Sequence, residues 1–246
     1  MIDPVPSLSS LRQEIDAIDD SIHDLLMRRA EIVQRVAGLG RVGKIPFRPG
    51  READIITRLL ARHTGPLARR ALVRWWREMY AAYIGIETAF TIAVAEPAGP
   101  GGEYAAVARE QFGALTPLRL HASARQVIDD VSTGRATAGV LPMPSGADWW
   151  PDLLKRDGAR VHIVERLPFW STRPEGAPTA EAFVIAVALA DPSTSDRSVL
   201  LAEQNDPDVT GNVVARCTAG ILFEVAGYVG SDDPRLLGHY AVPVAA

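Results

Sequence analysis

Residues 11–33 read "LRQEIDAIDDSIHDLLMRRAEIV", and the spacing of their apolar residues decides the fold of the first part of the chain. The apolar positions follow one another in steps of three and four residues: Leu8, Leu11, Ile15, Ile18, Ile22, Leu25, Ile32, Val36 and Leu39. This spacing predicts one helix from about Ser7 to about Leu39, with Ser9 or Ser10 as its N-cap. At ~1.5 Å per residue the helix is roughly 50 Å long, so it is expected to need a partner helix.

Arg29 stands in the one gap of this apolar seam. One interpretation is that its guanidinium reaches water past its neighbours, or sets the register of a coiled coil. The other is that it lines a polar pocket inside a helical bundle, where an anionic ligand pairs with it. An unpaired buried charge costs several kcal/mol, so a partner is expected in the second case.

Two more helices are predicted before residue 90. The segment "GKIPFRPG" (43–50) ends the first helix, and the second begins near Arg51, where free amide groups favour an anion. Simple helix-end chemistry is the alternative role for Arg51 and Glu52. The third helix follows "HTGP" (63–66) and runs to about Phe90; it places Glu87 in a row of aromatic residues, where it could reach water or pair with a nearby arginine.

After residue 90 short apolar runs alternate with helical segments, which predicts an α/β sheet domain over residues 91–195. The expected strands are "FTIAVAEP", "PLRLHA", "TAGVLPM", "VHIVERLPF" and "AFVIAVALA", and the expected helices are "GPGGEYAAVAREQFG" and "SARQVIDDVSTGRA". The glycine-rich turn at 99–102 is expected to be an ordinary turn, with an anion cradle as the alternative. The tail, 196–246, is expected to contain a helix from Asn212 to Val229.

The composition of the 246 residues narrows the possible functions. The net charge of −4 is uneven, with +3 in residues 1–90 and −7 in the remainder, which is too weakly basic for a nucleic-acid-binding protein. No apolar run approaches the ~20 residues that span a membrane, and no secretory signal is expected at the start. The single cysteine, Cys217, excludes an internal disulfide and a cysteine-based metal site, which favours the cytoplasm. We expect no metal and no cofactor.

Residues 8–90 resemble the all-helical chorismate mutase family, through "LRQEIDAIDDSIHDLLMRRAEIV", "PFRPGREADIITRL" and "RWWREMYAAYIGIE". The resemblance implies a three-helix domain over residues 1–90 that forms an intertwined homodimer through its first helices. It also implies that chorismate is the substrate and that each site borrows Arg12 from its partner. Arg29 and Arg51 would bind the carboxylates of the substrate, and Glu52 would accept a hydrogen bond from its ring hydroxyl.

Glu87 would then face the ether oxygen of the bond that breaks, and Arg48 would add positive charge at the mouth of the site. The conversion of chorismate to prephenate is a one-substrate rearrangement that needs a compact conformer and stabilisation of charge on that oxygen. Arginines in a dry pocket can supply both. A carboxyl donates to an ether oxygen only when protonated, so activity is expected to be better at mildly acidic pH.

The sequence departs from the family in two places that matter. A lysine late in the first helix is usual, and this chain has Gly40; Arg41 or Lys44 could substitute for it. Tyr83 replaces a serine that is common near the end of the third helix.

Residues 91–190 resemble the catalytic domain of prephenate dehydratase, a periplasmic-binding-like sheet domain, through "IAVAEPAGPGGEYAAVAREQFG", "SARQVIDDVSTGRATAGVLPMPSG" and "EAFVIAV". A Glu-Asn-Ser run is replaced by Met143, Pro144 and Ser145, and a Thr-Arg-Phe run by Glu181, Ala182 and Phe183. These losses predict an inactive dehydratase-like domain. The tail is similar to part of the regulatory α+β domain that follows dehydratases.

Three functions follow from these features. The first is a chorismate mutase of aromatic amino acid biosynthesis. The second is a non-catalytic sensor or scaffold that binds an aromatic metabolite or a partner enzyme, which the glycine at position 40 favours. The third, which the missing residues oppose, is a bifunctional mutase–dehydratase.

Overall fold

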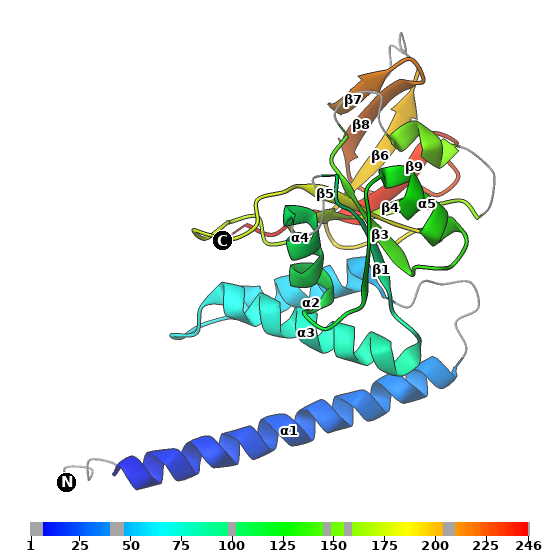
Figure 1. Ribbon diagram of the computed structural model, residues 1–246. Coiled ribbons are helices and arrows are strands. Elements are labelled where there is room, and N and C mark those ends of the chain that lie inside the picture. The colour runs from blue at the N-terminus through cyan, green and yellow to red at the C-terminus, as the bar shows by residue number, and fades with distance from the viewer. Residues whose placement is uncertain are drawn as a thin grey trace. The chain divides into compact units, whose positions relative to one another are not determined.

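The computed structural model describes residues 7–39, 47–97, 102–144, 149–154, 159–203 and 210–245. The chain divides into two compact units, Met1–Val42 and Gly43–Ala246. The helices are α1 (Leu8–Gly38), α2 (Pro49–Ala61), α3 (Arg69–Glu87), α4 (Glu103–Phe112) and α5 (Ala124–Ser132), with a short 3₁₀ helix at Trp150–Leu154 (Figure 1). The strands are β1 (Ile92–Ala95), β2 (Leu118–His121), β3 (Ala138–Pro142), β4 (His162–Leu167), β5 (Ala182–Ala186), β6 (Asp196–Ala202), β7 (Asn212–Cys217), β8 (Gly220–Ala226) and β9 (Leu236–Ala241). A helical segment followed by a sheet domain confirms the predicted fold class.

The first unit is the long helix α1, as the apolar spacing predicts. Its N-cap is Ser7, whose hydroxyl accepts a hydrogen bond from the Ser10 N–H at 3.1 Å, so the prediction of Ser9 or Ser10 was wrong. None of the residues of α1 is buried. The apolar seam therefore faces solvent in the single chain, with Leu25 64% exposed and Ile18 52% exposed.

The second unit is built on one nine-stranded sheet with the order β2-β1-β3-β5-β4-β9-β6-β8-β7. Parallel pairing joins β1 to β2 and β3, and most of the remaining neighbours are antiparallel. The five strands predicted between residues 90 and 190 are confirmed. Strands β6 to β9 continue the same sheet, so the boundary predicted at residue 195 falls inside this unit.

The helix predicted from Asn212 to Val229 was wrong, because this segment forms the antiparallel hairpin β7–β8. Gly220 opens β8 with a φ of +139°, which a residue with a side chain rarely adopts. A Cβ at this position would lie 2.3 Å from the backbone oxygen of Ala202 on β6. The close approach of the neighbouring strand selects glycine and the extended conformation, which apolar spacing alone does not reveal.

Helices cover both faces of the parallel part of the sheet. Helix α5 packs Val127 and Val131 against one face, together with Ala93 and Ala95 of β1. Helix α4 packs on the other face, where the alternate β1 residues lie in the core with Val107 and Phe112. Since successive side chains of a strand point to opposite faces, the continuous apolar runs in the sequence reflect a sheet that is buried on both sides.

Helices α2 and α3 belong to the second unit, so the boundary predicted at residue 90 also falls inside it. Ile56 and Leu60 of α2 share a core cluster with Val73 of α3 and with Phe169 and Trp170. Helix α3 ends at Glu87 instead of Phe90. Phe90 lies beyond it and packs its ring against those of Phe47 and Phe112, with centroids about 6 Å apart.

Candidate functional site

The start of α2 is held against the loop that follows β5. Arg48, the N-cap, forms an ion pair with Asp191, and Asp54 accepts hydrogen bonds from the backbone and hydroxyl of Thr194 at 2.9 and 2.7 Å. Gly50 permits this approach, because a Cβ there would lie 2.0 Å from the Asp191 backbone oxygen. A cavity of about 630 Å³ lies at this junction; its charged lining residues are Arg48, Arg51, Asp54, Arg58 and Asp191.

Glu52 connects the start of α2 to a buried arginine on α3. Its Oε1 accepts from the Arg48 backbone N–H at 3.2 Å, and its Oε2 accepts from Arg77 Nη1 at 2.9 Å. Arg77 is only 3% exposed, and the same Nη1 lies 3.7 Å from Oε1 of Glu165 on β4. Gln111 of α4 donates to that Glu165 oxygen at 2.6 Å. We call Glu52, Arg77, Gln111 and Glu165 the Arg77 network.

The Arg77 network contains a carboxyl whose proton affinity is unusual. Burial raises the pKa of Glu165 to about 7, because removal from water disfavours the charged form. The Arg77 charge and the Gln111 hydrogen bond act in the opposite direction, while the negative charge of Glu52 raises the pKa further. Glu165 therefore changes its charge near neutral pH inside the core.

The structure brings together three of the six site residues predicted from the sequence. Arg48, Arg51 and Glu52 lie on the first turn of α2 or directly before it. Glu87 is the last residue of α3 and is half-buried. Arg12 is exposed and Arg29 is partly exposed, and both belong to the first unit with α1. Gly40, Arg41 and Lys44 lie outside the described residues.

Sequence reasoning missed Glu165 and gave Arg77 a different role. Arg77 is one of the arginines near Glu87 in the sequence that could pair with it, but in the structure it contacts Glu52 and Glu165. The available signal was the charged residue in the middle of the apolar strand "VHIVERLPF". A buried carboxylate in such a position requires a partner, but sequence spacing does not say which cation supplies it.

The positions where a dehydratase would carry threonine and arginine hold different chemistry. Glu181 forms an ion pair with Arg166 at 3.2 Å. Ala182 and Phe183 are fully buried, and the Phe183 ring packs against Trp149 and Tyr240. Met143 and Pro144 follow β3, and Ser145 lies outside the described residues. These side chains provide neither a hydroxyl nor a guanidinium to a substrate at the start of β5.

Among the described residues, none of the helices has both the length and the hydropathy needed to span a bilayer. In the same part of the chain, no three His, Cys, Asp or Glu side chains come together as ligands for a metal ion.

The fold and site define a chain with a long unpaired helix, two helices that place arginines and a glutamate at one junction, and a mixed sheet. Residues 11–88 match the family described as chorismate mutase type II. The match runs from the first turn of α1 past the end of α3.

Curated relatives of the chain are longer proteins. The bifunctional chorismate mutase/prephenate dehydratase of Stutzerimonas stutzeri is 27% identical over 147 residues, which are 57% of this chain and 40% of that protein. The chain thus spans about two fifths of the length of the relatives it matches.

Solved structures show weaker likeness. GqqA, described as a novel type of quorum quenching acylase, has a TM-score of 0.43 at 16% identity, covering 62% of this chain and 95% of the other. Prephenate dehydratase from Streptococcus mutans has a TM-score of 0.38 at 11% identity, covering 62% of this chain and 98% of the other. At these values neither likeness supports an argument about function.

Proposed function

We propose that this protein is a chorismate mutase, which rearranges chorismate to prephenate without a cofactor. The observation that carries the proposal is the combination of the family match over residues 11–88 with an exposed apolar seam on α1 that contains Arg29. The proposed compartment is the cytoplasm, in keeping with the single cysteine.

A homodimer through α1 is part of the proposal. A 31-residue helix without a buried residue exposes a row of leucines and isoleucines that folding of the single chain leaves in water. Burial of apolar area stabilises association at roughly 25 cal/mol per Å² before the costs of association are subtracted. Since the seam repeats every 3.5 residues on average, a second copy of α1 is the partner that fits it best.

Pairing of the two helices would place Arg29 in a dry setting, where a substrate carboxylate can neutralise it. Arg51 at the start of α2 would hold the second carboxylate, and Arg12 of the partner subunit would complete the cationic lining. Positioned guanidiniums bind carboxylates through two parallel hydrogen bonds, which selects one conformer of the substrate. That selection is the main catalytic demand of a rearrangement without a nucleophile.

Glu52 and Glu87 have distinct proposed roles. Glu52 would accept a hydrogen bond from the ring hydroxyl of the substrate, and its hydrogen bond with Arg77 supports this by fixing its carboxylate in position. Glu87, in its protonated form, would donate a hydrogen bond to the ether oxygen of the breaking bond. Arg48 would contribute charge at the mouth, after exchanging Asp191 for the substrate carboxylate.

The test is to give the full-length protein chorismate and to follow its disappearance by ultraviolet absorbance. We expect Arg29→Gln to lower kcat/KM by about 10²- to 10³-fold, the usual effect of removing a preorganised charge. Arg28→Gln is the matched control, because Arg28 is the adjacent, exposed arginine outside the seam. Equal activity of the two variants, or an unaltered rate without Arg29, would refute the assignment. Sedimentation should give twice the chain mass of 26.5 kDa.

A non-catalytic binding protein is the second candidate. The observation that favours it is that two of the predicted binding side chains already have partners in the second unit, Arg48 with Asp191 and Glu52 with Arg77. The same assay separates the two functions, since retained binding of chorismate without turnover supports the second. Phenylpyruvate among the products would instead indicate a bifunctional enzyme.

A further inference from the structure

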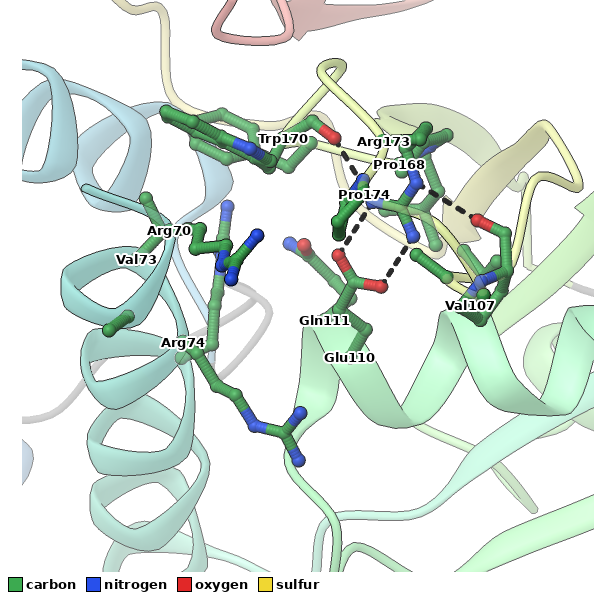
Figure 2. A pocket seen from close by; sticks show the side chains of 17 residues that line it. Arg70, Val73, Arg74, Val107, Glu110, Gln111, Pro168, Trp170, Arg173 and Pro174 are labelled. Atoms are coloured by element: carbon green, nitrogen blue, oxygen red, sulfur yellow. Dashed lines mark hydrogen bonds and ion pairs between the residues drawn. The ribbon is translucent and has the colours of Figure 1, made fainter. Parts of the chain in front are cut away.

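A second cavity, of about 460 Å³, lies between α3, α4 and the loop that follows β4 (Figure 2). None of the six proposed mutase residues lines it. Its volume falls within the range of about 300–1,000 Å³ that is typical of small-molecule sites. All its lining residues belong to the second unit, so its shape does not depend on the placement of α1.

The cavity is strongly cationic. Arg70 and Arg74 of α3 both line it, with their guanidinium groups directed to different parts of the cavity (Figure 2). Both side chains are exposed, and neither forms an ion pair within the part of the chain that the structure describes. Arg173 also lines the cavity, but both of its terminal nitrogens donate to the Glu110 carboxylate, at 2.8 and 2.7 Å. Glu110 is the one acidic residue among the residues that line the cavity.

Arg77 belongs to the wall of this cavity. Its Nη1 donates to Glu52, while its Nε and Nη2 are buried and have no hydrogen-bond acceptor among the described residues. The Phe169 ring centroid lies 4.4 Å from its guanidinium carbon, and both residues line the cavity. The charge of Arg77 is balanced by Glu52 and Glu165, so the free positive charge of the cavity comes from Arg70 and Arg74.

The walls of the cavity are apolar. Phe169 and Trp170 form one side together with Leu167 and Pro168, and Val107 of α4 forms part of the other. Trp170 is 7% exposed, so its ring is fixed by the core and not by solvent. A bare inorganic anion would leave these walls in contact with water, whereas a neutral apolar ligand would leave Arg70 and Arg74 without a counter-charge.

We propose that this cavity binds a small organic carboxylate whose apolar body has the size of a single ring. Arg70 and Arg74 hold the carboxylate by charge-assisted hydrogen bonds, and the ring lies against Phe169 and Trp170. This site is separate from the proposed mutase site, and the proposal does not require the mutase activity.

Benzoate is a suitable probe, and calorimetric titration of the full-length protein measures its binding. We expect saturable binding that the double variant Arg70→Gln/Arg74→Gln weakens by about tenfold for each arginine, the usual effect of a lost hydrogen bond to a charged group. Both side chains are exposed, so the variant should keep its fold, which circular dichroism checks. Arg125→Gln, an exposed arginine on α5 outside the cavity, is the matched control and should bind benzoate within twofold of the unmodified protein.

Four outcomes would overturn the proposal. Absence of benzoate binding would remove the site, and equal binding by the double variant would remove the role of the two arginines. Binding of inorganic phosphate as tight as that of benzoate would show an anion site without use of the apolar walls. Benzyl alcohol tests the charge, and we expect it to bind at least tenfold more weakly than benzoate; equal binding would contradict the assignment.

Discussion

Replacement of Glu165 by glutamine should change how the stability of the second unit depends on pH. In the folded protein burial raises the pKa of Glu165 to about 7, compared with 4.5 for an exposed glutamate. The folded state therefore binds this proton more tightly than the unfolded state does. Ionisation of Glu165 lowers the free energy of unfolding. The stabilisation by its protonated form is therefore greatest below pH 4.5 and is lost as the pH rises through 7.

The size of the effect follows from the two pKa values. Each unit of difference corresponds to about 1.36 kcal/mol, so complete ionisation of Glu165 lowers the free energy of unfolding by about 3 kcal/mol. Most of this loss, about 2 kcal/mol, should occur between pH 5 and 8. In Glu165→Gln the side chain stays neutral, and its amide oxygen can still accept the hydrogen bond that Gln111 donates to Glu165.

The assay is urea unfolding of both proteins between pH 5 and 8, followed by circular dichroism. Other groups titrate over this range; burial lowers the pKa of His162 to about 4, for example, and that group contributes stability that is lost as the pH falls below about 6.5. Such contributions are common to both proteins and cancel in the difference. Between pH 5 and pH 8 the free energy of unfolding of the variant should rise by about 2 kcal/mol relative to that of the unmodified protein. A difference that is constant with pH would show that Glu165 does not titrate in the core.

Four other substitutions test three separate features. Arg77→Met should lower the free energy of unfolding by about 3 kcal/mol, since it leaves the buried Glu165 and the partly buried Glu52 without their cation. Urea unfolding at pH 7 measures the change, and an unaltered free energy of unfolding would mean that water reaches the network. Gly50→Ala should destabilise by about 1–3 kcal/mol through its clash with Asp191, whereas Gly85→Ala, with nothing within 4 Å, should stabilise α3 by up to about 1 kcal/mol. If both glycine substitutions changed the free energy of unfolding in the same direction, the close approach of Gly50 to Asp191 would be refuted. Ile18→Glu should abolish the proposed dimer without unfolding the second unit, and an unchanged sedimentation mass would rule out pairing through this seam.

Much of the fold could be predicted because it depends on local pattern. The three- and four-residue steps of α1 and the apolar runs of β1 and β3 report which faces need burial, and both patterns survive in the structure. The segment 212–229 lacked such a signal. Its apolar residues fit either conformation, and the choice of a hairpin depends on pairing with β6, a contact between residues distant in sequence.

The candidate site was less predictable because its partners come from distant elements. The sequence places Arg51 and Glu52 at the start of a helix, which the structure confirms. That Arg48 would face Asp191, and Glu52 a cation on α3, depends on how α2 packs against the sheet. Spacing along one helix contains no information on the charges that another element brings to it.

The Arg77 network explains why α2 and α3 belong with the sheet and not with α1. Glu165 of β4 and Glu52 of α2 are two carboxyls near one buried guanidinium, and removal of either would leave the cation with less compensation. Arg77, which also contacts Glu165 of the sheet, therefore fixes the position of Glu52. Any substrate that uses Glu52 must bind with Arg77 in place, so the sheet domain sets the geometry of a residue proposed for the mutase reaction.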